Sequence, residues 1–501
     1  MHAGPRSPFL LGIALAAAGA TPALAQNLSL DKVGGVLGGT ISYPIHGNPN
    51  EPYFLLCDIF EQQTPLPALG ITLDITDQFA WLTFSVPGWI GVTNAQGNAT
   101  PQIGIPNDPL FSSFTWSLQA IAGAGPYRVS NLVRLTLQDP ATWVPALNDP
   151  SVPVIGGGTA VAPNNELLFV GGSGPVAQRY KSRTEEWELA GASFGVGLLS
   201  QTTGLADGRV LFTGGLDLTT GQPTAAAAIY DPATQTTTTL TMASPRAGHG
   251  ASLMPNGKVL VTGGSTAFDL QNPLSLFTGL LGTTELFDPT TNAFTAGPTM
   301  LEPRAFHTST TLTTGRVLIA GGMAVLPIVN IPNVSSTAYL FNPTTNSFGL
   351  PSLMNGARFM HTATALSNGR VLLVGGLNLD LTTFLTTLDP LDIVIGTRTD
   401  CQVFAQGGIF GTFTTVNGMQ VGRAGAAVAP LANGGAVIAG GFQLTIDIAT
   451  STFVLNATAT SDRFTQSPNL IAPVGSMAAP RLFPTTVNLP DGSVMVVGGG
   501  P

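Results

Sequence analysis

One pattern recurs along this chain and constrains its fold more than any other feature. It runs Pro-Arg, often a His, an apolar segment, a tight turn and a second apolar segment that ends in Gly-Gly. The clearest copies read PRAGHGASLMPNGKVLVTGG (245–264), PRAFHTSTTLTTGRVLIAGG (303–322) and ARFMHTATALSNGRVLLVGG (357–376). Such a repeat favours a stacked or circular architecture, because each unit buries its apolar surface against its neighbours.

Each copy is predicted to form four short strands. In residues 303–348 they are expected at 307–312, 316–320 and 338–341, with a fourth opening at Phe348. Gly in the turns permits positive φ, and Asp-Pro or Asn-Pro sets the next corner. The sequence therefore predicts an all-β fold of radially repeated four-stranded sheets, as in a β-propeller. Seven Gly-Gly pairs mark the units: 171–172, 214–215, 263–264, 321–322, 375–376, 440–441 and 498–499.

Aromatic residues follow the Gly-Gly pairs at regular places. They are Tyr180, Tyr230, Phe287, Phe341 and Phe404, followed by later aromatics at Trp187, Phe294 and Phe348. With the Gly-Gly pairs, this pattern resembles the kelch motif over about residues 131–501. The resemblance implies a seven-bladed kelch-type propeller of an exported bacterial type, distantly similar to the central domain of galactose oxidase. Blades one and two lack the Arg and His, and blade six has Arg423 but Ala427 at the His position.

The seventh copy stops after its second strand. The segment LVRLTLQDPATWVPAL (132–147) contains Asp139-Pro140, which matches the turn between the third and fourth strands. Residues 131–147 are therefore predicted to complete the last blade, which would remove two exposed sheet edges. The alternative is that Ser130–Leu137 forms the last strand of the preceding domain.

The N-terminus reads as a secretory signal over residues 1–25. Arg6 precedes an apolar stretch at 9–20, and Ala23-Leu24-Ala25 forms a small-x-small cleavage site. The mature protein is expected to be secreted, periplasmic or on the cell surface, with no membrane span. Residues 26–130 lack the repeat, and their short apolar runs predict a small N-terminal β-sandwich-like domain.

Charge and cysteine content exclude several classes of function. Only 9% of the 501 residues are charged and the net charge is −9, which argues against a nucleic-acid partner. Cys57 and Cys401 are expected to be two buried free thiols, although a disulfide between them is possible outside the cytoplasm. The Cys and His spacings indicate no zinc site, and no cofactor is predicted.

One Arg site recurs just before the first strand of five copies. Its members are Arg246, Arg304, Arg358, Arg423 and Arg481. Because the loops between the second and third strands emerge on the same face, these arginines are candidate ligands for an anion or a carbohydrate. The alternative is that each Arg ties blades together through carbonyls or a carboxylate. His249, His307 and His361 share a second repeated site, for which packing and hydrogen bonding are favoured over metal binding.

The loops between the second and third strands (b–c loops) are long and apolar at 265–282, 323–336, 377–399 and 442–459. Long loops in a compact domain are often functional. The sequence thus favours a binding or scaffold protein that recognises a protein or glycan through this face. The alternative is an extracytoplasmic enzyme, galactose-oxidase-like or glycan-processing, for which no catalytic residue is nominated.

Overall fold

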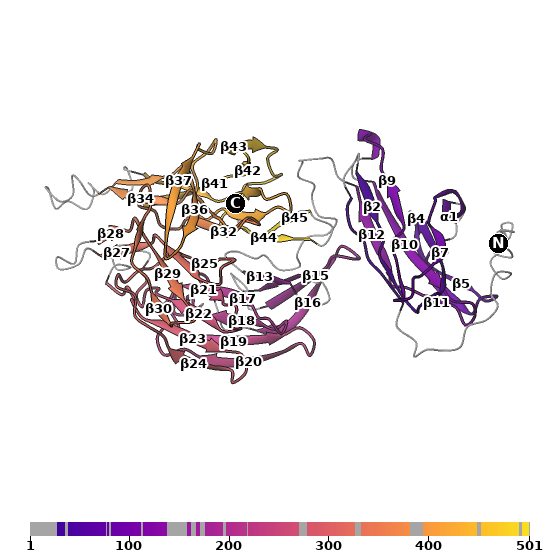
Figure 1. Cartoon of the computed structure of the whole chain (residues 1–501), viewed down its shortest axis with the longest axis horizontal. Helices are drawn as coiled ribbons and strands as arrows, with labels where there is room; N and C mark the ends of the chain where they lie inside the picture. The colour runs from indigo at the N-terminus through magenta and orange to yellow at the C-terminus, as the bar shows by residue number, and fades with distance from the viewer. Residues whose placement is uncertain are drawn as a thin grey trace. The chain divides into compact units, whose positions relative to one another are not determined.

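The structure is a computed structural model that describes most of the chain. The described residues are 28–35, 39–76, 78–79, 82–111, 114–137, 158–161, 167–170, 176–193, 197–217, 219–269, 278–325, 332–380, 394–447, 452–489 and 493–499. The predicted signal peptide and the pair Gly171–Gly172 lie outside these residues. The fold is all-β, with many small antiparallel sheets (Figure 1). Its described helices are two short turns, α1 (Leu82–Ser85) and η2 (Pro109–Phe111).

The chain divides into two compact units. The first contains a five-stranded sheet, a three-stranded sheet and two two-stranded sheets. These are β4 (Pro52–Asp58), β7 (Ile90–Val92), β10 (Thr115–Ala122), β11 (Arg128–Val129) and β12 (Val133–Thr136); β1 (Ser29–Leu30), β3 (Ile45–His46) and β8 (Asn98–Ala99); β2 (Thr40–Ser42) with β9 (Gln102–Gly104); and β5 (Glu61–Leu66) with β6 (Ile71–Ile75). Leu55 and Leu118 of the large sheet pack with Leu30 and Ile41 of the smaller sheets, so the layers enclose one apolar core.

Strand β12 bears on the predicted completion of the last blade. It pairs antiparallel with β10, which places Thr136 opposite Thr115. Val133–Thr136 is therefore a strand of the N-terminal sheet, as the alternative interpretation has it. Residues 138–147 lie outside the described part, so their completion of the last sheet stays a prediction.

The second unit is a series of sheets, which we number 1 to 7 with strands a to d in chain order. Sheets 1 to 3 are β13 (Gly158–Val161), β14 (Leu167–Val170), β15 (Val176–Lys181), β16 (Glu186–Ser193); β17 (Gln201–Gly204), β18 (Val210–Thr213), β19 (Ala226–Asp231), β20 (Thr236–Thr241); and β21 (Gly250–Leu253), β22 (Val259–Thr262), β23 (Thr284–Asp288), β24 (Ala293–Ala296). Each has the spatial order a-b-c-d, so neighbouring strands along the chain are neighbours in the sheet.

Sheets 4 to 7 continue the series with one addition and one truncation. They are β25 (Thr308–Thr311), β26 (Val317–Ala320), β29 (Thr337–Asn342), β30 (Ser347–Phe348), β31 (Ser352–Leu353); β32 (Thr362–Ala365), β33 (Val371–Val374), β36 (Cys401–Gly407), β37 (Phe410–Val416); β38 (Ala427–Pro430), β39 (Ala436–Ala439), β42 (Ser461–Gln466), β43 (Asn469–Val474); and β44 (Thr485–Asn488), β45 (Val494–Val497). The strands of sheet 4 lie within one residue of the bounds predicted from the sequence.

Burial follows position within a sheet. Strand b is wholly buried in sheets 2 to 5, because strands a and c flank it and adjacent sheets cover both faces. The repeated aromatics lie on strands c and d, where their rings pack in pairs such as Phe287 with Phe294, 5.0 Å between centroids. In sheet 5 the irregular second half supplies Phe413 as the partner of Phe404, also at 5.0 Å.

Successive sheets meet through their first strands. Strands β13, β17, β21, β25, β32, β38 and β44 contact one another in that order, and β44 also contacts β13. Thr159 of β13 donates a hydrogen bond to the carbonyl of Thr486 in β44, at 3.2 Å. Strand a of each sheet therefore lies beside strand a of the next sheet.

Candidate functional site

The repeated arginines clamp the Gly-Gly pairs of their own sheets. In each case Nη1 donates to the carbonyl of the first Gly, 17 residues ahead. The pairs are Arg246 to Gly263 (2.7 Å), Arg304 to Gly321 (2.8 Å), Arg358 to Gly375 (2.9 Å), Arg423 to Gly440 (3.4 Å) and Arg481 to Gly498 (2.7 Å). Each clamp holds the start of strand a against the end of strand b.

Four of these arginines also pair with a carboxylate. Arg246 contacts Glu285 (2.7 Å), and Arg304, Arg358 and Arg423 contact Glu302, Asp400 and Asp462 (2.6 Å each). All four guanidinium groups are completely buried. Burial lowers the pKa of each Arg, and the adjacent carboxylate opposes that shift.

This burial bears on the predicted role of the five arginines as ligand contacts. A dissolved ligand cannot reach Arg246, Arg304, Arg358 or Arg423 without displacing partners that already occupy their donors. Their geometry is that of the alternative, a tie to carbonyls and a carboxylate, made within one sheet rather than between blades. Arg481 retains a partly exposed side chain. Ligand binding by the repeated arginines stays a prediction, and Arg481 is the member that a ligand could reach without displacing buried partners.

The three repeated histidines join neighbouring sheets. Nε2 of His249 and of His307 each lie 2.8 Å from a Thr hydroxyl of the preceding sheet, Thr213 and Thr262. The preceding sheet has Ala320 at the equivalent position for His361, which instead contacts Thr308, the residue paired with Ala320, at 3.0 Å. This repeated packing and hydrogen bonding is the role that the sequence favoured.

The Gly-Gly pairs leave room for those histidines. A Cβ on Gly263 would lie 3.0 Å from Cε1 of His307 in the next sheet, and one on Gly264 would lie 3.0 Å from Cβ of His249 in its own sheet. Both glycines have positive φ. In sheet 6 the residue three positions after Arg423 is Ala426, which packs against Gly441, so the His position there is Ala426 and the predicted Ala427 was wrong by one residue.

A chain of backbone hydrogen bonds links five consecutive sheets. Its members lie between the Arg and His positions: Leu199, Gly248, Phe306, Met360 and Gly425. Each amide donates to the preceding member's carbonyl, from Gly248 to Leu199 (3.3 Å), Phe306 to Gly248 (2.6 Å), Met360 to Phe306 (3.0 Å) and Gly425 to Met360 (3.0 Å). All five have φ between 51° and 62°. We call this feature the girdle.

Three of the predicted b–c loops are hairpins that extend beyond their sheets. They are β27 (Met323–Val325) with β28 (Pro332–Val334), β34 (Leu377–Asp380) with β35 (Val394–Thr397), and β40 (Phe442–Asp447) with β41 (Thr452–Ala457). Strand β28 contacts β34 and β35 contacts β40, so the hairpins stand side by side (Figure 1). Their roots pack with Phe306, Met360 and Phe483 in one apolar cluster.

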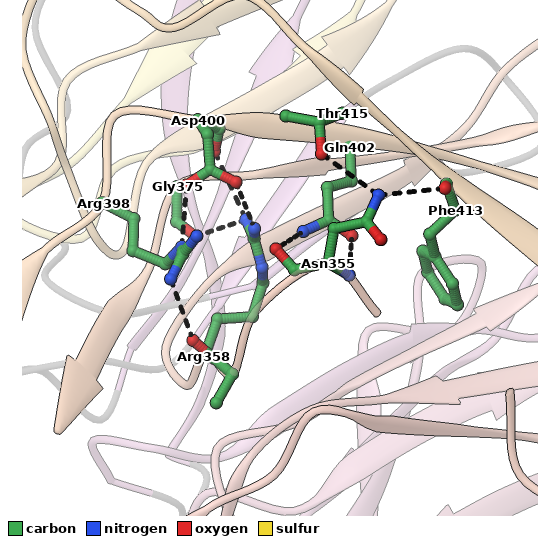
Figure 2. Close-up of polar contacts among 9 residues, drawn as sticks. Asn355, Arg358, Gly375, Arg398, Asp400, Gln402, Phe413 and Thr415 are labelled. Carbon is green, nitrogen blue, oxygen red and sulfur yellow. Dashed lines mark hydrogen bonds and ion pairs between the residues drawn. The ribbon is translucent and has the colours of Figure 1, made fainter. Parts of the chain in front are cut away.

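A partly exposed ion pair lies at the root of the middle hairpin. Asp400 accepts from Arg358 through Oδ2 (2.6 Å) and from Nε of Arg398 through Oδ1 (2.7 Å). Figure 2 shows the carboxylate between the two guanidinium groups. Burial acts to raise the pKa of Asp400, but hydrogen bonds and charge from Arg398 and Arg358 outweigh it and lower the pKa.

Beside this pair, Asn355 joins strands c and d of sheet 5. Its side chain takes no part in the ion pair. Instead, Nδ2 donates to the carbonyl of Phe413 (3.0 Å) and to Oγ1 of Thr415 (3.1 Å). Gln402 returns a hydrogen bond to the carbonyl of Asn355 at 2.9 Å (Figure 2). These contacts fix strand β36, which begins directly after Asp400, so the sheet sets the position of the carboxylate.

The sequence did not identify the carboxylates, because their spacing from the Arg varies. Glu285 and Asp462 lie 39 residues after their arginines, Asp400 lies 42 after, and Glu302 lies two before. In sheet 4, Tyr339 occupies the strand c position that holds Glu285 in sheet 3, and Arg304 lies over its ring at 4.9 Å. An acidic residue two positions before the repeated aromatic was a usable signal in sheets 3 and 6 only.

Among the described residues, no group of three or more His, Cys, Asp or Glu side chains is arranged to hold a metal ion. Cys57 and Cys401 are both buried free thiols, and burial raises the pKa of each to about 12. Neither short helix in the described part of the chain has the length or hydrophobicity to cross a membrane.

Comparison with known proteins gives limited information. No protein-family model matches the chain, and no curated protein matches it. Among solved structures, it is similar to a fungal alcohol oxidase of the AA5 family in complex with copper. That match has 14% identity, covers 61% of this chain and 71% of the oxidase, and has a TM-score of 0.38. A similarity this low carries no argument about the activity of this chain.

Proposed function

We propose that this chain is an exported binding protein that recognises a glycan or a protein through the face carrying its b–c hairpins. In this proposal sheets 1 to 7 are the blades of a kelch-type propeller, with strand a of each blade innermost. The serial contacts of the a strands, and the contact of β44 with β13, support that arrangement.

The observation that carries the proposal is the exposed part of the Arg398–Asp400 pair. The two side chains keep about a fifth of their surface in solvent, 21% and 23%, whereas four of the five repeated arginines keep none. A guanidinium beside an ionised carboxylate offers fixed donors and acceptors for hydroxyl groups or for a peptide backbone.

The surrounding hairpins complete the surface. Val394, Val454 and Leu455 are exposed on them, next to buried roots such as Leu377 and Phe442. Apolar side chains around a few polar groups are typical of binding sites, because burial of the former supplies affinity and the latter fix orientation. The pair lies at the root of one of the hairpins that carry these exposed apolar side chains.

A binding screen tests the proposal. The mature chain from Gln26 is screened against glycan and protein arrays, and each ligand is tested again with Arg398→Ala. The control is Arg209→Ala, which breaks a similarly exposed pair with Asp207 at an a–b turn. We expect a specific ligand that Arg398→Ala loses at least tenfold while Arg209→Ala retains it, with similar melting temperatures.

Absence of a specific ligand, or equal binding by both variants, would contradict the proposal. Galactose-oxidase-like or glycan-processing activity stays the alternative prediction. Copper content and product release from the purified chain test it directly.

A further inference from the structure

A second exposed apolar surface lies on sheets 4 and 5, apart from the b–c hairpins. Its side chains are Leu350 (69% exposed), Leu353 (73%), Ile409 (63%) and Phe410 (43%), which we call the rim patch. Large exposed side chains in a group mark interaction surfaces, whereas single ones are ordinary.

Contacts between the two sheets bring these residues together. Strand β31, which contains Leu353, contacts β37, which begins at Phe410. The amide of Gly411 donates to Oγ of Ser352 at 3.3 Å, and a Cβ on Gly349 would lie 3.8 Å from the carbonyl of Ile409. The four side chains therefore belong to one surface that spans two sheets.

The segments that form this surface carry no charge. Residues 342–357 and 401–422 contain no Asp, Glu, Lys or Arg, in a chain with a net charge of −9. The bordering charge is Arg316, whose Nη1 donates to the carbonyl of Gly408 at 3.4 Å. Net charge opposes the association of two copies of this acidic chain, and that repulsion is weakest where a neutral surface forms the contact.

The edge strand of sheet 5 also lacks features that would prevent association with a second copy of the chain. Strand β37 is the outermost strand of its sheet and contains neither a charged residue nor Pro, the usual devices that prevent edge pairing. Ser352 and Asn355 already bond the Gly411 amide and the Phe413 carbonyl of this strand, so the edge is only partly open, but the surface beside it is apolar and neutral and can pack against a copy of itself. Such a surface suits an isologous interface about a two-fold axis.

We infer that the rim patch is a dimerisation surface whose partner is a second copy of this chain. Binding of a glycan or protein at the b–c hairpins is not required for it, so the two proposals fail independently. Because net charge opposes the association, raising the salt concentration is expected to strengthen it.

Sedimentation velocity of the full chain over a range of concentrations tests this inference. The wild type should approach twice the single-chain mass of 51.4 kDa. Leu353→Asp with Ile409→Asp should raise the dimer Kd at least tenfold. The control Leu301→Asp alters an equally exposed leucine (81%) outside the patch and should behave as the wild type.

Cross-linking gives a second readout that does not depend on disrupting the surface. Ile409→Cys should form an interchain disulfide under mild oxidation, and Leu301→Cys should not, since Cys57 and Cys401 are buried. A wild type that stays monomeric at high concentration would overturn the inference. So would a dimer that both the double Asp variant and Leu301→Asp leave intact.

Discussion

Nη2 of Arg423 donates a 2.6 Å hydrogen bond to Oδ2 of Asp462, and both side chains are out of contact with solvent. Burial raises the pKa of Asp462 although the Arg423 charge opposes that shift. Burial therefore removes both charges from water, and their mutual attraction offsets this desolvation only while both partners are present.

Breaking this pair should destabilise the protein strongly. We expect Arg423→Ala to lower the free energy of unfolding by about 3–5 kcal/mol, because Asp462 is left buried and unpaired. Replacing both residues, Arg423→Met with Asp462→Leu, should recover the part of the loss that comes from the unpaired carboxylate, but not the bonds of Arg423 to the carbonyls of Gly440 and Thr460. Urea denaturation measures both. Arg209→Ala, at a partly exposed pair, should cost about 1 kcal/mol or less; an equal loss at Arg209 and Arg423 would contradict the structure.

The buried histidines should make stability depend on pH. Burial lowers the pKa of His249 to about 3, and burial with neighbouring Arg and His charges lowers that of His307 well below its usual value. The unfolded chain binds protons below about pH 6.5 that the folded chain does not bind. Stability is thus complete above pH 6.5 and should fall as the pH decreases, by about 1.4 kcal/mol per pH unit for each His.

Denaturation between pH 7.5 and 5 measures that slope. His307→Gln should reduce the slope by about one proton. An unchanged slope in His307→Gln would show that the imidazole titrates in the folded state.

A substitution in the girdle should destabilise the protein by more than positive φ alone accounts for. A Cβ on Gly248 (φ 62°) would lie 2.9 Å from the ring of Phe306, whereas one on Gly257 (φ 80°) meets nothing within 4 Å. Gly257→Ala should cost about 1–2 kcal/mol, and Gly248→Ala should cost at least about 1 kcal/mol more because of overpacking. Thermal and urea unfolding compare the two variants, and equal losses would argue against the contact.

The thiols should be unreactive until the fold opens. Because burial raises the pKa of Cys57 and Cys401 to about 12, neither is a thiolate at neutral pH. A thiol reagent at pH 8 should label both residues slowly in the native protein and two thiols promptly in urea. Rapid native labelling of Cys401 would contradict its position in strand β36.

The regular part of the fold could be predicted because the same strand and turn pattern recurs in several copies of the repeat. Each Gly-Gly pair, Arg and His recurs with the same spacing, and the strands of sheet 4 follow from turn chemistry and alternation. Four of the five repeated arginines are buried against a carbonyl and a carboxylate for the same reason, because a residue that recurs at one position of the repeat makes the same packing contacts in each sheet.

Other features depend on contacts that spacing does not encode. Glu302 replaces a strand c carboxylate from a different loop because Tyr339 occupies that strand position. Likewise, Arg398 lies beside Asp400 at the root of a hairpin and belongs to no repeat. Strand β12 pairs with β10 in the N-terminal sheet, although residues just after it match the repeat signature.

The girdle bears on how the number of repeats in such a chain can change during evolution. The three inner members, Gly248, Phe306 and Met360, each accept a bond from the following sheet and donate one to the preceding sheet, so sheets 3 to 5 each carry a complete connector. A tandem duplication of one repeat would insert a unit that already matches both neighbours. Gene duplication of one such repeat can therefore add a sheet whose connecting residue finds an acceptor on one side and a donor on the other.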